Sequence, residues 1–315
     1  MEKVTESRRA FVQSLGNGAV GAALLSGAAR PLRAAFPLGL APGLQLWSIR
    51  EDLARDEDTT LRKISRIGYR ELEHYEMPRS PSEFRRKCDD AGLKLVSAHF
   101  DMPLAQFGGQ RTVDGAKEMG LQYMIVVFPT LRSLSGPNIP EMSFSELSVR
   151  YEKISLDDYK WNAEQFNRLG DRVKKAGMQL GYHNHAIDLK KLQGGVVGLD
   201  TLIQGTDPDL VVFEMDCAHV IHAGGDPISY LQKYPGRIRM IHVKDLEAGY
   251  SISTTLDTED KDTDAEIGAG VIDWKRLFGV AKTGNLKHWF VEHEGKMAHP
   301  PMDSIRISYN YLKQM

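Results

Sequence analysis

Strand and helix signals alternate eight times along this chain, and this alternation most constrains how it can fold. Apolar runs with strand character are followed by segments with helical spacing of apolar residues, many closed by a glycine. The expected strands are residues 43–49, 69–75, 93–100, 121–128, 178–185, 209–218, 237–245 and 287–294. The expected helices are residues 58–68, 80–92, 111–120, 156–177, 197–206, 227–236, 271–284 and 304–315, the first capped by Asp58 or Thr59. Because strand–helix–strand units make parallel pairs and eight units close a barrel, we predict the α/β class with a single (β/α)8 TIM barrel over residues 40–315.

Length and composition agree with one barrel. The chain has 315 residues, of which 42% are hydrophobic, enough for a core of ordinary size. An open, doubly wound sheet is the alternative, but the glycine-rich nucleotide loop usual after its first strand is absent. Two long connections, residues 129–154 and 246–270, are expected to be insertions on the barrel rim, where loops often carry function.

The first 35 residues differ from the rest. Arg8 and Arg9 follow a serine and precede "AFV", and a short run of small apolar residues comes next. This pattern is typical of a twin-arginine signal peptide over residues 1–35, cleaved between Ala28 and Ala35. The alternative is a frayed N-terminal helix rich in alanine and glycine. The apolar run is shorter than the ~20 residues of a membrane span. We therefore expect an exported, periplasmic protein with no membrane association after cleavage.

The net charge and the two cysteines argue against a DNA-binding protein and against a cysteine metal site. The formal net charge is −2, without the basic excess of a typical DNA-binding protein, so no nucleic-acid partner is expected. Cys88 and Cys217 lack the spacing of a metal site, and two free, buried thiols are favoured over a disulfide.

Polar residues gather where the predicted strands end, which is where barrel enzymes carry their active sites. His183 and His185 are two residues apart, so in an extended strand both face the same way. The same parity pairs Glu214 with Asp216, His242 with Lys244, and Glu292 with Glu294. Imidazoles and carboxylates from successive strands suit a divalent metal such as Mn²⁺, Co²⁺, Zn²⁺ or Fe²⁺, and suit Ca²⁺ poorly. The alternative is that each histidine is a hydrogen-bonded structural residue.

The chain from about Leu40 resembles the sugar isomerase/epimerase superfamily with the xylose isomerase-like barrel. The resemblance rests on "GLQLWSIRED", "LRKISRIGYRELE", "GLKLVSAH", "GYHNH", "EMDCAH", "IHVKD", "IGAGVIDW" and "FVEHEG", in this order. Members are similar to inosose dehydratases and sugar epimerases, and endonuclease IV-type repair enzymes share the fold. In "IGAGVIDW" the glycines are expected to serve backbone geometry rather than phosphate binding.

The resemblance implies a metal site. Asp216, His242 and Glu292 match three of the usual ligands, while His183 stands where many relatives have a glutamate. It implies a divalent ion, Mn²⁺ or Co²⁺ first, with Zn²⁺, Mg²⁺ or Fe²⁺ as alternatives. One of His183 and His185 is expected to bind the metal and the other to face the substrate.

The histidine at the glutamate position changes the expected chemistry. We predict His183, Glu292 and His185 as catalytic residues, since an imidazole beside a cation stays neutral and can act as a base. The expected function is a metal-dependent sugar isomerase or epimerase that abstracts a proton next to a carbonyl. A lyase or dehydratase acting on a 3-keto-glycoside or inosose-like substrate is the alternative, and a non-catalytic sugar-binding barrel is the alternative of another class.

Weaker predictions concern the binding of a small sugar substrate. Glu73 and His99 are expected to contact hydroxyls at the barrel mouth, and His219 to assist near the metal. Trp47 is expected either to stack on a sugar or to pack in the core. Lys244 is expected either to bind an oxyanion or carboxylate, or to form a salt bridge with Asp245 or Glu214. Barrels of this type often pair, so a homo-oligomer is also an expectation.

Overall fold

The structure is a computed structural model that describes residues 36–101, 109–135, 144–256, 264–295 and 297–315. The predicted twin-arginine signal lies outside these ranges. Within them, no helix combines the length and the apolar character that crossing a membrane requires. Cys88 and Cys217 are both free and buried, as predicted.

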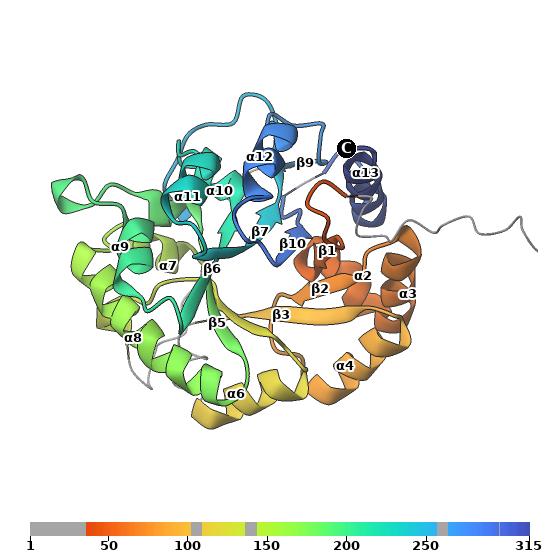
Figure 1. Ribbon diagram of the computed structural model, residues 1–315, viewed down its shortest axis with the longest axis horizontal. Helices are drawn as coiled ribbons and strands as arrows, with labels where there is room; N and C mark the ends of the chain where they lie inside the picture. Colours follow the sequence, from red (N-terminus) through yellow and green to blue (C-terminus); the bar gives the residue numbers. More distant parts are fainter. Residues whose placement is uncertain (1–35, 102–108, 136–143, 257–263, 296) are drawn as a thin grey trace, which may run out of the picture.

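Eight parallel strands form a closed barrel, which confirms the predicted fold (Figure 1). Neighbours follow chain order around the ring, and the last strand, β10, closes it against β1. The strands are β1 Gly43–Gln45, β2 Glu71–His74, β3 Lys94–Phe100, β4 Tyr123–Val126, β5 Gln179–His183, β6 Val211–Asp216, β7 Ile238–Val243 and β10 His288–Val291. Two further strands, β8 Asp245–Leu246 and β9 Asp264–Ala265, pair in antiparallel fashion outside the barrel.

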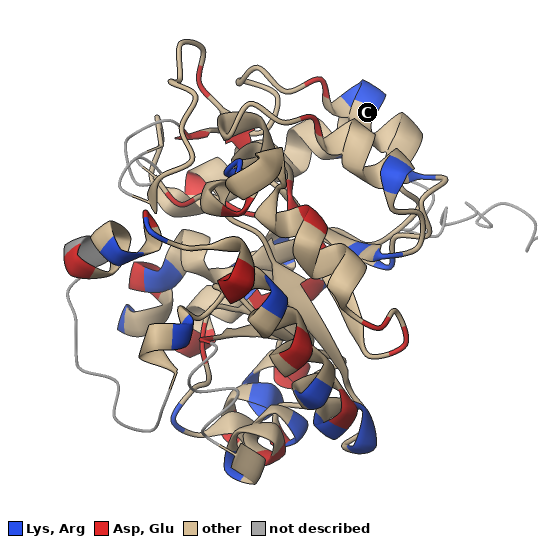
Figure 2. Ribbon diagram, turned by 90° about the vertical axis from the view of Figure 1, so that its left-hand side faces the viewer, with Lys and Arg blue, Asp and Glu red and all other residues tan. Residues whose placement is uncertain are grey.

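Helices surround the barrel in Figure 1. The eight predicted helices are present with shifted ends: α3 Glu57–Ile67, α4 Pro81–Asp90, α6 Gly109–Glu118, α8 Leu156–Lys175, α9 Gly198–Gly205, α11 Pro227–Lys233, α12 Trp274–Ala281 and α13 Pro301–Gln314. In the part of the chain that the structure describes, three further helices were not predicted: α2 Arg50–Arg55, α7 Phe144–Tyr151 and α10 Cys217–His222. Short 3-10 turns add η2 Leu46–Ile49, η3 Arg132–Leu134, η4 Ala186–Leu189 and η5 Gln193–Gly195. On the face that Figure 2 shows, acidic and basic residues are interspersed.

Several predicted boundaries are wrong for local reasons. The first strand ends at Gln45, because the Gln45 side chain accepts the backbone N–H of Trp47 and starts the turn η2. Helix α3 is capped by Asp56, not by Asp58 or Thr59, since the Asp56 carboxylate accepts the N–H of Thr59. The connection 129–154 contains α7, and the connection 246–270 contains β9.

A small apolar cluster fills the inside of the barrel below the strand ends. It consists of Val96, Ile125, Val212, Met240 and Phe290, all buried. Gly43 makes room for it, because a Cβ there would lie 2.4 Å from the Phe290 ring. The apolar filling leaves the polar side chains of the strand ends as a separate layer above it.

Candidate metal centre

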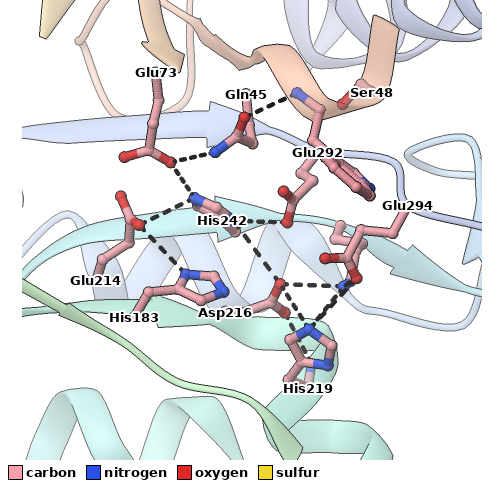
Figure 3. Close-up of polar contacts among 12 residues, drawn as sticks. Gln45, Ser48, Glu73, His183, Glu214, Asp216, His219, His242, Glu292 and Glu294 are labelled. Atoms are coloured by element: carbon pink, nitrogen blue, oxygen red, sulfur yellow. Dashed lines mark hydrogen bonds and ion pairs between the residues drawn. The ribbon is translucent and has the colours of Figure 1, made fainter. Parts of the chain in front are cut away.

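The four predicted metal ligands lie together at the carboxyl ends of four strands. His183, Asp216, His242 and Glu292 each offer one ligand atom within 4.8 Å of the others, and all four side chains are buried. The strand register places them, since Asp216 pairs with His242 and His242 with Phe290, two residues before Glu292. His242 Nδ1 lies 2.7 Å from Glu292 Oε2 and 3.9 Å from Asp216 Oδ2 (Figure 3).

The donor set fits a divalent ion. His183 Nδ1 and Asp216 Oδ2 are buried and make no hydrogen bond, although Glu214 Oε2 lies 3.3 Å from the first and Lys244 Nζ 3.4 Å from the second. Buried polar atoms without hydrogen bonds are costly, and a cation would satisfy both. Two imidazoles and two carboxylates are ligands that Mn²⁺, Co²⁺, Zn²⁺ and Fe²⁺ accept. Two overlapping sets have similar spacing: His99, His183, Glu214 and His242 below, and His183, His185 and His219 towards the rim. The assignment of the ion to the first set therefore remains a prediction.

The pKa values of the two histidines of the centre are shifted in opposite directions. Burial alone would lower the pKa of His242, but Glu292 and Glu214 raise it well above the usual value. Burial lowers the pKa of His183 well below its usual value, and repulsion from His242 and His185 adds to this. His183 is therefore neutral, as a metal ligand must be. At His242 the carboxylates favour a positive charge, which either a second proton or a bound metal ion can supply.

A polar layer lies directly beneath the four residues. Glu73 Oε1 is 2.8 Å from His242 Nε2 and 2.9 Å from His99 Nε2. Its side chain is fully buried, so Glu73 lies deeper than the barrel mouth at which we expected it. In the strand register Glu73 pairs with Gln45 and Ser97, and both of these side chains donate a hydrogen bond to its carboxylate. His99 lies between Glu73 and Glu214 and contacts both. Burial alone would lower the pKa of His99, but these two carboxylates raise it to about 10.

His185 faces the other side of the centre, towards the rim. Its Nδ1 is 2.9 Å from the carbonyl oxygen of Val127, which assigns the proton to Nδ1 and the lone pair to Nε2. The ring stacks on Phe128 with centroids 4.1 Å apart. Burial, reinforced by His219, lowers the pKa of His185 well below its usual value. His185 is therefore a neutral imidazole held in one orientation.

Lys244 joins the metal centre to the rim. Its Nζ contacts Glu294, lies 3.4 Å from Asp216 Oδ2 and lies 3.0 Å from His219 Nε2. The predicted alternative, a salt bridge with Asp245 or Glu214, is wrong. Asp245 instead accepts the N–H group of its neighbour Leu246 and, from the "IGAGVIDW" turn, those of Gly268, Ile272 and the Trp274 indole.

Trp47 stands at the edge of this region. It is 38% exposed, so packing in the core, one of its two predicted roles, is wrong. The ring packs edge-to-face on Tyr75, and the Arg50 guanidinium lies 4.2 Å from its centroid. Stacking on a sugar remains a prediction.

Some residues of the site were missing from the predicted set. Glu214 and Glu294 were recognised only as partners in strand parity, although both contact predicted site residues. Asn184 was not predicted as a site residue, yet its side-chain oxygen accepts a hydrogen bond from the backbone N–H of Asp216 at 3.2 Å. Gln45 and Ser97 carry no signal of their own, because single polar residues in apolar strands are common.

Comparisons with known proteins agree with this architecture. Residues 61–315 match the family described as xylose isomerase-like TIM barrel. An inosose dehydratase of Clostridium perfringens is 29% identical over 302 residues, which cover 88% of this chain and 96% of the relative. The crystal structure of a sugar phosphate isomerase/epimerase from Parabacteroides distasonis is similar with a TM-score of 0.68 and 24% identity, covering 87% of this chain and 93% of that chain. The crystal structure of the IOLI protein with a bound zinc atom is similar with a TM-score of 0.58 and 14% identity, covering 86% of this chain and 96% of that chain.

These findings agree with the recognised segments and with the barrel. The matched proteins are named inosose dehydratase and sugar phosphate isomerase/epimerase. This chain belongs to the family of xylose isomerase-like TIM barrels.

Proposed function

We propose that the protein is a divalent-metal-dependent enzyme that removes a proton next to the ketone of a cyclic polyol or keto-sugar, and that the reaction continues by loss of water. One observation carries the proposal: His183, Asp216, His242 and Glu292 converge in a buried site, where His183 Nδ1 and Asp216 Oδ2 make no hydrogen bond. The similarity to inosose dehydratase supports elimination as the outcome.

In this proposal the ion is held by His183, Asp216, His242 and Glu292. When bound, it polarises the substrate carbonyl and stabilises the negative charge that develops on its oxygen. Mn²⁺ or Co²⁺ is our first expectation, and the zinc atom in one structural neighbour supports a transition-type ion.

The residues around the centre supply the proton transfers. His185 Nε2, kept unprotonated by the Val127 carbonyl on the other nitrogen, takes the proton from the carbon next to the ketone. The electron pair of the broken C–H bond forms the new double bond as the neighbouring C–O bond breaks. Lys244 donates a proton to the departing hydroxyl, which leaves as water. Burial would lower the pKa of Lys244, but Asp216 and Glu294 raise it well above its usual value and keep it charged.

An isomerase or epimerase is the second candidate. It shares the first step but returns a proton to the substrate instead of expelling a hydroxyl. Glu292, which also holds the ion in this proposal, would pass that proton as a carboxylate, and burial makes it more basic by raising its pKa. The similarity to a sugar phosphate isomerase/epimerase supports this candidate.

Product analysis in deuterated water distinguishes the candidates. The protein, loaded with Mn²⁺ or Co²⁺, is incubated with inososes and 3-keto-glycosides and followed by NMR and mass spectrometry. We expect a product that has lost one water, whereas epimerisation gives an isomer carrying solvent deuterium. His185→Ala should abolish both. His288→Gln, which alters a histidine paired with Glu71 at the opposite end of the barrel, should leave turnover intact. Neither product nor exchange with any ketone would favour a non-catalytic sugar-binding barrel.

We also propose export by the twin-arginine route, supported by Arg8 and Arg9 and the residues around them. A reporter fused to residues 1–35 should reach the periplasm, and Arg8→Lys with Arg9→Lys should keep it inside the cell. If the unchanged fusion and the double-lysine fusion were exported equally well, the proposal of twin-arginine export would be wrong.

A further inference from the structure

The side-chain amide of Gln45 lies beneath the metal centre, and its orientation determines the direction of the hydrogen bonds around it. The backbone N–H of Trp47 donates to Gln45 Oε1 at 2.9 Å. The oxygen of this amide is therefore engaged, and its nitrogen must face the other way. Gln45 Nε2 donates to Glu73 Oε1 at 3.0 Å.

Glu73 is consequently held as an acceptor. Gln45 donates to Oε1, and the Ser97 hydroxyl donates to Oε2 at 2.6 Å. Glu73 is 0% exposed, so no bulk water competes for its oxygens. His242 Nε2, 2.8 Å from Oε1, must then be the donor in that contact.

The consequence falls on the opposite nitrogen of the same ring. With a proton on Nε2, the neutral His242 ring carries its lone pair on Nδ1. Nδ1 lies towards two carboxylates, 2.7 Å from Glu292 Oε2 and 3.9 Å from Asp216 Oδ2 (Figure 3). A lone pair facing two anions is unfavourable unless a positive charge lies between them. A second proton on Nδ1 or a metal ion meets that need, and the ion takes the place of the proton when it binds.

We propose that Glu73 is a positioning residue that fixes His242 in the Nε2–H tautomer, so that Nδ1 is the nitrogen presented to the metal. This inference rests on the proposed function and replaces the hydroxyl contact first expected of Glu73. A carboxylate on the outer nitrogen of a ligating histidine orients the ring and strengthens it as a ligand, and its loss typically weakens metal binding about 10- to 100-fold.

The chain offers a matched control in the same strand. Glu71 Oε2 lies 2.7 Å from His288 Nδ1, a second glutamate–histidine pair two residues away at the other end of the barrel. Glu71→Gln therefore makes the same chemical change in the same strand without touching His242. Ser97→Ala is a milder variant, which removes one anchor of Glu73 and leaves the carboxylate in place.

Two measurements test the proposal without using activity. Calorimetric titration with Co²⁺ should give one ion per chain and an affinity about 10- to 100-fold lower in Glu73→Gln. Ser97→Ala should show a smaller loss in the same direction, and Glu71→Gln should bind like the wild type. Nitrogen-15 NMR of the zinc-loaded wild type should show His242 with its proton on Nε2.

The outcomes separate this inference from the proposed function. If the wild type binds no divalent ion, both fail together. If the wild type binds one ion and Glu73→Gln binds it equally well, only the role of Glu73 is overturned. A His242 proton on Nδ1 in the zinc-loaded protein also overturns it. Two ions per wild-type chain would do the same, because the second set, His99, His183, Glu214 and His242, would then use His242 for another ion.

Discussion

His74 is a buried histidine outside the metal centre, and it makes stability depend on pH. Its side chain is 3% exposed, and its Nδ1 accepts the N–H of Glu76 at 3.1 Å. Burial lowers its pKa to about 4, from an ordinary value of 6.5. The unfolded chain therefore takes up a proton here below pH 6.5, while the folded chain does so only near pH 4. Stability is fully present above pH 6.5 and is lost as the pH falls towards 4, at up to about 1.4 kcal/mol per pH unit.

His74→Asn should remove this dependence, because the amide oxygen can still accept the Glu76 N–H and does not titrate. Urea unfolding between pH 6.5 and 4 measures the free energy of unfolding of both proteins. The variant should lose less stability across this range than the wild type. Parallel curves would show that His74 is not the titrating group.

The candidate ligands were predictable from sequence, but their surroundings were not. Strand parity places Asp216 and His242 on inward faces, and closure of the ring brings them together. The depth of Glu73 depends on the stagger between neighbouring strands, which no local pattern encodes. Gln45 matters only because its amide happens to lie between Trp47 and Glu73, a contact made by tertiary structure.

At the scale of elements, the turn before α12 depends on a glycine without a side chain. A Cβ at Gly270 would lie 2.3 Å from Asp245 Oδ1 and 2.5 Å from the carbonyl oxygen of Leu246. Because the second of these is a backbone atom, the turn must shift to admit it. Gly270→Ala should cost about 1–3 kcal/mol in the free energy of unfolding, as overpacking does.

Gly279 provides a control, because the same substitution there should raise the free energy of unfolding instead of lowering it. It lies inside α12, and a Cβ there would meet nothing within 4 Å. Gly279→Ala should therefore stabilise the protein by up to about 1 kcal/mol through helix propensity. Chemical denaturation of both variants checks the pair. A Gly270→Ala protein as stable as the wild type would contradict the close approach of this turn to Asp245.

Comparison of the predicted with the observed helices and strands shows which sequence patterns were reliable. Alternating apolar runs and helical spacing located all eight barrel strands and eight helices. Helix α10 was missed because "CAHVIH" is as apolar as a strand. The available clue was Asp216, whose carboxylate caps the helix by accepting the N–H of His219. Helix α7 was missed because serine-rich composition suggested a loop.

For the whole molecule, the proposed ion should contribute to folding stability. A ligand that binds only the folded state adds about 2.7 kcal/mol at a free concentration 100 times its Kd. Mn²⁺ or Co²⁺ should therefore raise the Tm of the metal-free protein, and EDTA should reverse the shift. His183→Ala should show a much smaller shift than the wild type. Equal shifts in both proteins would place the stabilising ion elsewhere.

The central claim is that His183, Asp216, His242 and Glu292 hold one divalent ion between them. Anomalous diffraction at the cobalt edge, from crystals grown with Co²⁺, tests it most directly. The account predicts a single strong peak in the barrel, about 2.0–2.2 Å from one ligand atom of each of the four side chains. A barrel without a peak, or a peak bonded to a different set such as His99 and Glu214, would contradict it.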